Sequence, residues 1–201
     1  MAICDKKIDG GIEFDCDLTG GVEANLYLFN REEITSYLRN VTNTQIIEDF
    51  VMQIITPGTP AVTAKGYLFE GMNLSVKPKT DLVKKPYKPE YNHLVDFLVF
   101  NRSSASKQQL ENMARSRSGL VAVVEHLGKT TDSTFEILGT DVGLRLVALS
   151  DDPTNTDNGG AYVLQLSSPD EFKEPHMPAT FFDTDYATTK ATLLALIAPN
   201  V

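Results

Sequence analysis

The chain has 201 residues, of which 42% are hydrophobic, so it can bury a sizeable core within one domain. Its 27 acidic and 18 basic side chains give a net charge of −9, which argues against a general nucleic-acid-binding protein, because such proteins need a basic surface. No stretch is apolar enough to predict a membrane span or a secretory signal. We therefore expect Cys4 and Cys16 to be free thiols in a reducing cytosol, with a disulfide that staples the N-terminal region as the alternative.

The first fifty residues predict an arm followed by strands. Residues 1–20 are expected to be an arm, because paired glycines mark its bends. Residues 22–28 alternate between apolar and polar side chains, which predicts a strand. Residues 31–40 have the length of a short helix but no decisive pattern. Residues 46–55 are rich in β-branched and aromatic side chains and end at Thr-Pro-Gly, so we expect another strand.

A segment rich in proline and lysine follows. Residues 67–76 alternate and residues 94–100 are strongly apolar, and both patterns predict strands. Between them, residues 77–91 hold three prolines and five lysines. Proline removes a backbone donor and breaks helices, so we expect an exposed loop or an excursion at a sheet edge. The five lysines are Lys77, Lys79, Lys84, Lys85 and Lys88.

A helix that leads into a hairpin is predicted next. Ser106 and Gln109 have the spacing of a capping box, so a helix over residues 106–118 is expected to begin there. Its narrow apolar stripe consists of Leu110, Met113 and Ala114. Residues 120–124 and 135–138 are apolar and β-branched or aromatic, and they predict two antiparallel strands against which this helix lies.

The C-terminal third predicts two more strands, a tail and a helix. Residues 142–149 and 161–166 read as strands on either side of a polar turn over residues 151–160. Residues 167–186 contain three prolines and are expected to be a tail. Residues 187–198 predict a terminal helix whose apolar face needs a covering surface.

Together these elements predict a mainly β fold, an antiparallel sandwich or barrel with one flanking helix and a C-terminal helix. The expected division is an N-terminal arm (1–20), a β-sandwich domain (21–168) and a C-terminal tail and helix (169–201).

Chemistry-bearing patterns are sparse. His93, His126 and His176 are far apart in sequence and match no catalytic motif, so each is expected to be a surface or core residue. The loop over residues 151–158 does not fit a calcium loop, because no frame has both the required glycine and the final glutamate. We therefore predict no catalytic, cofactor or metal site, and a protein that is not an enzyme. A hydrolase whose carboxylates assemble only in space stays an alternative.

The charge distribution is uneven. The lysines of residues 77–88 are opposed only by Asp81, whereas residues 151–185 hold eight acidic side chains and one base, Lys173. One interpretation is two solvated loops of opposite sign. The other is a molecule with a basic and an acidic pole, which suits head-to-tail association.

The order of these segments resembles a known family. The sequence runs through YLFEGMNLSV, LVDFLVF, QLENMARSRS, LVAVVEH, FEILGTDVGLRL, GAYVLQLSS and then Glu174-Pro175. This order is similar to that of structural proteins from tailed bacteriophages that infect Bacteroidetes, including crAss-like phages, and among them to tail-tube or tail-ring components. The resemblance covers roughly residues 65–178 and is carried by element order and short phrases.

The resemblance implies a β-sandwich with one flanking helix, with strand and turn over residues 31–40. It also implies a virion protein of the tail or neck, assembled in the host cytoplasm, whose subunits close into a ring through which the genome passes. Six subunits are the expectation and twelve the alternative. Its partners would be copies of itself, other tail or connector proteins, and passing DNA that is not specifically bound, with no membrane.

Other functions stay open at this point. They are a head–tail connector or tail-terminator protein, a carbohydrate-binding or adhesin-like β-sandwich, and the hydrolase. If the chain assembles, the lysine–proline segment is the expected contact, because prolines lower the entropy cost of ordering and tyrosines supply contact area. The acidic residues 13–17 or 151–185 of a neighbour are the expected receivers. The candidate subunit-contact residues are Lys84, Lys85, Tyr87, Lys88 and Tyr91.

Overall fold

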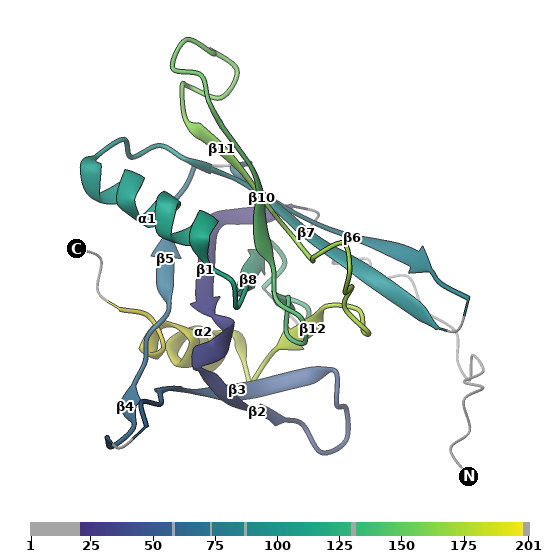
Figure 1. Cartoon of the computed structure of the whole chain (residues 1–201). Helices are drawn as coiled ribbons and strands as arrows, with labels where there is room; N and C mark the ends of the chain where they lie inside the picture. Colours follow the sequence, from purple (N-terminus) through teal and green to yellow (C-terminus); the bar gives the residue numbers. More distant parts are fainter. Residues whose placement is uncertain (1–20, 58, 73, 87, 130–131, 199–201) are drawn as a thin grey trace.

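Two packed β-sheets and two α-helices make up the computed structural model, which describes residues 21–198 apart from residues 58, 73, 87, 130 and 131 (Figure 1). The predicted arm over residues 1–20, with Cys4 and Cys16, lies outside the described residues. The described elements are, in chain order, β1 (Val22–Asn30), the 3-10 helix η1 (Arg31–Glu33), β2 (Ile34–Arg39), β3 (Ile46–Ile54), β4 (Val62–Thr63), β5 (Tyr67–Phe69), β6 (Val76–Lys84), β7 (Pro89–Val99), α1 (Ser104–Arg115), β8 (Leu120–His126), β9 (Phe135–Leu138), β10 (Arg145–Asp151), β11 (Tyr162–Ser167), β12 (Ala179–Phe181) and α2 (Tyr186–Ala195).

The two sheets differ in size. The eight-stranded sheet has the order β2-β3-β12-β9-β8-β1-β5, with β4 also paired to β3, and the four-stranded sheet has the order β10-β11-β7-β6. The pairing of β12 with β3 is parallel, and the other strand pairs described are antiparallel. The sheets form an open sandwich and no closed barrel, so the predicted mainly β fold with two helices is confirmed in its sandwich form.

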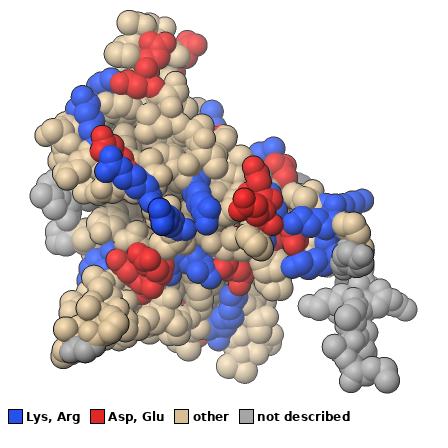
Figure 2. Space-filling view, viewed as in Figure 1, with Lys and Arg blue, Asp and Glu red and all other residues tan. Residues whose placement is uncertain are grey.

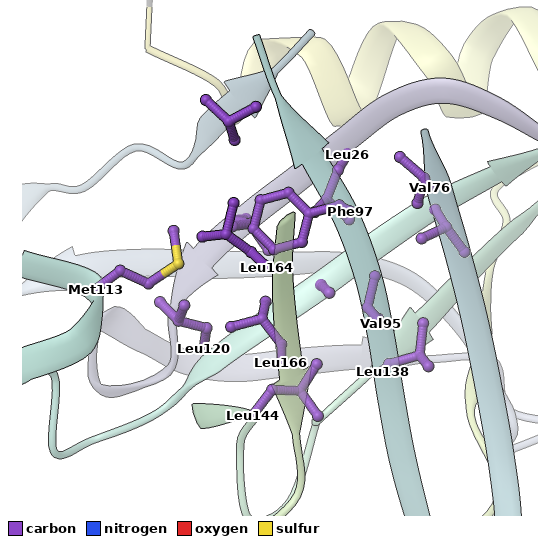
Figure 3. Packing of buried hydrophobic residues seen from close by; sticks show 14 of the residues in the cluster. Leu26, Val76, Val95, Phe97, Met113, Leu120, Leu138, Leu144, Leu164 and Leu166 are labelled. Carbon is purple, nitrogen blue, oxygen red and sulfur yellow. The ribbon is translucent and has the colours of Figure 1, made fainter. Parts of the chain in front are cut away.

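The first core lies between the two sheets. Successive side chains of a strand point to opposite faces, so Leu26 and Leu28 of β1 turn toward the four-stranded sheet. There they join Phe97 of β7 and Leu164 and Leu166 of β11 in one buried cluster (Figure 3). Through this cluster, one face of the four-stranded sheet packs against the eight-stranded sheet.

A second core lies on the other face of the same strands. Tyr27 and Phe29 of β1 belong to a buried cluster that includes Phe50 of β3 and Leu193 of α2. The rings of Phe29 and Phe50 meet edge-on with their centroids 4.9 Å apart, a favoured aromatic geometry. The eight-stranded sheet is therefore covered on both faces, which explains why β8 is a run of consecutive buried residues from Leu120 to Glu125.

Helix α1 is shifted relative to its prediction. The cap is Ser103, whose side-chain oxygen accepts a hydrogen bond from the Ser106 N–H at 3.1 Å, so Ser106 lies inside the helix. Leu110 and Met113 are buried as expected, but Ala114 is exposed. The helix ends at Arg115, because the N–H of Ser116 turns back to the carbonyl of Met113.

The structure resolves two predictions that were left open, over residues 31–40 and 77–91, and corrects one over residues 67–76. Residues 31–40 form the short helix η1 and strand β2. Residues 77–91 form most of a β6–β7 hairpin, in which β6 pairs with β7 along its whole length. Pro78 fits there because β6 is an edge strand, where a missing backbone donor is tolerated. Within residues 67–76, only Tyr67–Phe69 of β5 and Val76, the first residue of β6, are in strands among the described residues.

The segment after residue 168 is part of the sandwich, so the predicted tail is wrong over β12. This strand inserts between β3 and β9 and buries Phe181. Helix α2 packs its buried face, including Thr189 and Leu193, on the second core. The covering surface that the apolar face needs is therefore supplied at Leu193 by this chain itself. Neither helix of the described residues is long and apolar enough to cross a membrane.

Candidate subunit interface

The tip of the β6–β7 hairpin carries the predicted lysines. Lys84 ends β6 opposite Pro89, so Lys85 and Lys88 lie in the connecting turn. All three lysines are exposed, and the tip projects from the sandwich as a basic cluster (Figure 2). They line an open hollow of about 310 Å³ together with Pro86 and Pro89. A hollow lined by three cations can receive a carboxylate or another anion.

One buried acid neutralises part of this cluster. Glu90 forms ion pairs with Lys85 and, at 3.2 Å, with Lys88. The hydrogen bond from Lys85 is the main reason why the pKa of the Glu90 carboxyl lies below its ordinary value. Among the described residues Lys84 forms no ion pair, so it is the cation most available to a partner. The sequence did not reveal this difference, because the pairing depends on the hairpin fold.

The two candidate tyrosines are placed differently. Tyr87 lies outside the described residues. Tyr91 is half-buried, away from the turn, and its backbone N–H donates to the Glu174 carbonyl at 2.7 Å while its own carbonyl accepts from the Glu174 N–H at 2.9 Å. Tyr91 therefore anchors the segment after β11 to β7.

The four-stranded sheet ends in two free edges. Strand β6 forms one edge and β10 the other, and among the described residues each pairs with a strand on one side only. Helix α1 also contacts β10, and Leu144 directly before β10 bridges to Leu120 of β8. Every side chain of β10 except that of Leu146 is exposed. Such edges present unpaired backbone N–H and C=O groups that can pair with another chain. The sequence analysis did not identify the β10 edge, because edge position depends on strand order.

The outer face of this sheet is polar and carries both charges. Lys77 and Asp96 are cross-strand partners on this face, and the Asp96 carboxylate accepts a hydrogen bond from the Gln165 side chain at 2.8 Å. Lys79 forms an ion pair with Asp81 at 2.8 Å. An exposed sheet face of this kind needs no apolar cover.

An acidic loop lies at the opposite end of the same strands. The register places the hairpin tip at one end of β7 and Val99 at the other. At that second end Val99 pairs with Tyr162 of β11, and Tyr162 pairs with Asp151 of β10. Asp151 is held by Arg102 at 2.5 Å, so the carboxylates of Asp152 and Asp157 remain to give this end its negative charge. Figure 2 shows acidic side chains at the top of the molecule, away from the basic tip on the right.

His93 is a buried structural residue. Its Nδ1 accepts a hydrogen bond from the Gly139 N–H at 3.1 Å, so Nε2 carries the proton and donates to the His176 carbonyl at 3.0 Å. Burial lowers the pKa of His93 to about 4, which keeps the ring neutral. Since both ring nitrogens are occupied, His93 is not poised for acid–base work.

Glu174 is a second buried polar group, and the sequence analysis named it only as part of the Glu174-Pro175 phrase. Its carboxylate accepts hydrogen bonds from the backbone N–H groups of Asp141, Val142 and Gly143 at 3.0, 2.9 and 3.1 Å. Burial raises the pKa of Glu174, and the three backbone hydrogen bonds oppose that shift. The contact locks the turn before β10 to the segment after β11.

A third polar cluster fastens helix α2 to the sheet. The buried Glu125 carboxylate accepts hydrogen bonds from the Tyr186 hydroxyl at 2.7 Å and from the Lys190 ammonium at 3.1 Å. Desolvation lowers the pKa of Lys190, but the hydrogen bonds to Tyr186 and Glu125 outweigh it, so the pKa lies above its ordinary value. Lys190 therefore stays charged and acts as an anchor.

The described residues contain no group of three or more His, Cys, Asp or Glu side chains that could hold a metal ion. The polar clusters found in them join elements of the fold to one another. The charged tips and the strand edges of the four-stranded sheet are the exposed features that could contact a partner. Comparison of the chain with family models, curated proteins and solved structures gives no match.

Proposed function

We propose that this chain is a ring-forming structural protein of a bacteriophage virion, a subunit of a tail tube or tail ring through which DNA passes. The bacteriophage setting comes from the order of sequence segments described above. The assembly proposal is carried by one observation, the pair of free edges on the four-stranded sheet.

Because the sheet has four strands, its two edge strands run in directions that allow them to pair with each other between copies. Adjacent strands of the four-stranded sheet are antiparallel, so β6 and β10 run in opposite directions. If rotation about an axis places the β6 edge of one copy beside the β10 edge of the next, the new pair is again antiparallel. A head-to-tail contact of this kind closes into a ring when the rotation closes.

The electrostatics support passage of DNA without tight binding. The net charge of −9 repels phosphate groups. The lysines on the outer sheet face, Lys77 and Lys79, have Asp96 and Asp81 beside them. If this face lines the bore, its balanced charge would bind DNA only weakly. Lys84, which forms no ion pair with a described residue, lies away from this face at the hairpin tip.

The poles at opposite ends of the sheet favour repeated stacking. A basic tip on one ring can meet the acidic β10–β11 loop of the next, which suits a tube. A head–tail connector or tail terminator is the second candidate, and it would form a ring without stacking.

Electron microscopy of the purified chain, with mass measurement in solution across micromolar to near-millimolar concentration, tests the proposal. We expect closed rings, with six subunits or twelve, and stacks of rings at low salt. Rings that never stack would favour the connector. A chain that stays monomeric throughout would overturn the ring.

A further inference from the structure

The open edge of β6 exposes the backbone groups of every second residue. Directly before β6, the Ser75 carbonyl accepts a hydrogen bond from the Leu98 N–H of β7 at 3.0 Å. Hydrogen bonding alternates along an antiparallel pair, so the odd-numbered residues of β6 bond to β7. The even-numbered residues, such as Thr80, therefore turn their N–H and C=O groups to the open edge. Pro78 agrees with this assignment, because a proline in an edge strand turns its nitrogen away from the neighbouring strand.

The side chains along this edge differ between its two faces. Val76 belongs to the first core, and Leu82, on the same face, is 53% exposed. Lys77 and Lys79 are exposed on the other face, which is the outer face of the sheet. Lys77 forms no ion pair with a described residue, and Lys79 pairs with Asp81. A strand that fits this edge therefore needs apolar side chains on one face and acidic side chains on the other.

Residues 12–18 of this chain have that pattern. Apolar and acidic side chains alternate strictly in the order Ile12, Glu13, Phe14, Asp15, Cys16, Asp17 and Leu18. In a strand, this alternation places all the acidic side chains on one face and the apolar side chains on the other. Two glycines precede the segment and two follow it after Thr19, which marks its ends. The segment lies outside the described residues, so the pattern of its sequence is what indicates a strand.

The end of this segment can reach the start of β6 in the same chain. The Ser75 hydroxyl donates to the Ala24 carbonyl at 3.3 Å, so the start of β1 lies beside the start of β6. Five residues separate Cys16 from Val22. This connection spans up to about 20 Å when extended. A segment that ends beside the start of β6 runs antiparallel to β6, because its earlier residues then lie toward the hairpin tip.

The charges select one register for this pairing. In that register Glu13 lies opposite Lys79, and Asp15 lies opposite Lys77, on the outer face. A shift of two residues toward the hairpin tip would place Glu13 opposite Asp81, which is a repulsive pair. A shift of two residues the other way would leave Lys79 with no acid opposite. One register therefore matches both lysines and places no acid of the segment opposite Asp81.

The same register matches the inner face. It places Phe14 opposite Pro78 and Ile12 opposite Thr80, where apolar side chains extend the covered face of the sheet. Pro78 lacks an N–H, so one hydrogen bond of the new ladder is missing. Lysine and proline on an edge discourage pairing with a foreign strand. Acidic side chains that lie opposite the lysines make the edge selective for this segment instead.

We infer that residues 12–16 add to the edge of β6 in the same chain, as a fifth strand of the four-stranded sheet. The added strand does not require the proposed ring. It would restrict the ring, because a β6 edge that holds this segment can pair with β10 of another copy only after the segment leaves.

A cysteine pair tests the contact and its register. Opposed residues of this kind have Cα atoms about 5.5 Å apart, which suits a disulfide. In a background with Cys4→Ser and Cys16→Ser, Phe14→Cys with Pro78→Cys should lose both thiols under mild oxidation and remain a monomer on a nonreducing gel. Glu13→Cys with Pro78→Cys is the matched control and should keep its thiols, because residue 13 faces the other side. Free thiols in the first pair, equal oxidation of both pairs, or a disulfide between two chains would overturn the inference.

Hydrogen exchange of the Thr80 amide tests the same contact without cysteines. In the monomer of the full chain this N–H should be protected, because it donates to the added strand. Phe14→Asp places a charge on the apolar face of the segment and should speed the exchange at least about tenfold. Ile3→Asp, outside the segment, is the matched control and should leave the exchange unchanged. An unprotected Thr80 amide in the wild-type monomer would overturn the added strand and leave the proposed ring standing, because the ring is tested by assembly.

Discussion

The eight-stranded and four-stranded sheets bury their surfaces differently. In the eight-stranded sheet, β8 is buried on both faces, between the four-stranded sheet and helix α2. The four-stranded sheet is buried on one face, and its edges are the long strands β6 and β10. The larger sheet is therefore buried within the chain on both faces, whereas the smaller sheet leaves one face and two strand edges exposed, and these are the surfaces that the proposed function would use. Substitutions in the two sheets should separate folding from assembly.

The largest effect on folding should come from Phe181→Ala. Phe181 of β12 is buried, and its ring packs edge-on against that of Phe50 with centroids 5.8 Å apart. Removing a buried phenylalanine side chain leaves a cavity and lowers the free energy of unfolding by about 3–5 kcal/mol. Chemical denaturation measures this value. Phe172→Ala, at an exposed phenylalanine, is the control and should change it by no more than about 0.5 kcal/mol.

The same residue illustrates how far the sequence predicts the fold. Apolar runs rich in β-branched residues, such as residues 120–124, give the correct strand type because local pattern and burial agree. Ala179–Phe181 is only three residues long and lies among prolines, so local pattern indicates a tail although long-range pairing makes a strand. The lysines of the candidate site were found by composition alone. The β10 edge depends on strand order, which no local pattern encodes.

A smaller loss is expected from Glu174→Gln. The carboxylate of Glu174 accepts three backbone hydrogen bonds, and an amide offers a single acceptor oxygen in its place. Leaving buried N–H groups without an acceptor should lower the free energy of unfolding by about 2–3 kcal/mol. Glu171→Gln, at an exposed glutamate, should leave it unchanged. Equal stability of both variants would show that Glu174 does not hold the turn.

The two histidines with shifted pKa values should give opposite pH effects. Burial lowers the pKa of His93 from 6.5 to about 4, so the unfolded chain takes up the proton first and stability falls as the pH drops below 6.5. The hydrogen bond to Glu136 raises the pKa of His126. The stabilisation that His126 gives the folded chain is therefore present at low pH and is lost as the pH rises through the raised pKa.

Unfolding measurements between pH 6.5 and 5 test this difference. The contribution of His93 to the free energy of unfolding should fall by about 1.5 kcal/mol between pH 6.5 and pH 5. The variant His93→Gln should remove that loss from the pH profile, whatever its effect on stability at neutral pH. His126→Gln should instead make the loss at acid pH steeper. A His93→Gln profile that stays parallel to that of the wild type would show that His93 does not titrate as its burial requires.

The smallest effect on folding, with a clear effect on assembly, should come from Lys84→Glu. Lys85 and Lys88 are unsuitable because each forms an ion pair with Glu90, and reversing either would place two like charges together at the hairpin tip. Exposed charges contribute little to stability, so the free energy of unfolding should change by no more than about 0.5 kcal/mol. If the basic tip docks on an acidic loop of another copy, the variant should associate several-fold more weakly.

Salt and a matched lysine separate docking from general charge. Salt screens exposed charges, so wild-type association should weaken between low and high ionic strength, and the variant should respond less. Lys107→Glu, at an exposed lysine of α1, changes the net charge equally and should leave association unchanged. Equal weakening by both substitutions would assign the effect to net charge. Normal assembly of Lys84→Glu at low and high salt would show that the basic tip is solvated surface, and the free edges alone would then have to account for the contacts between copies.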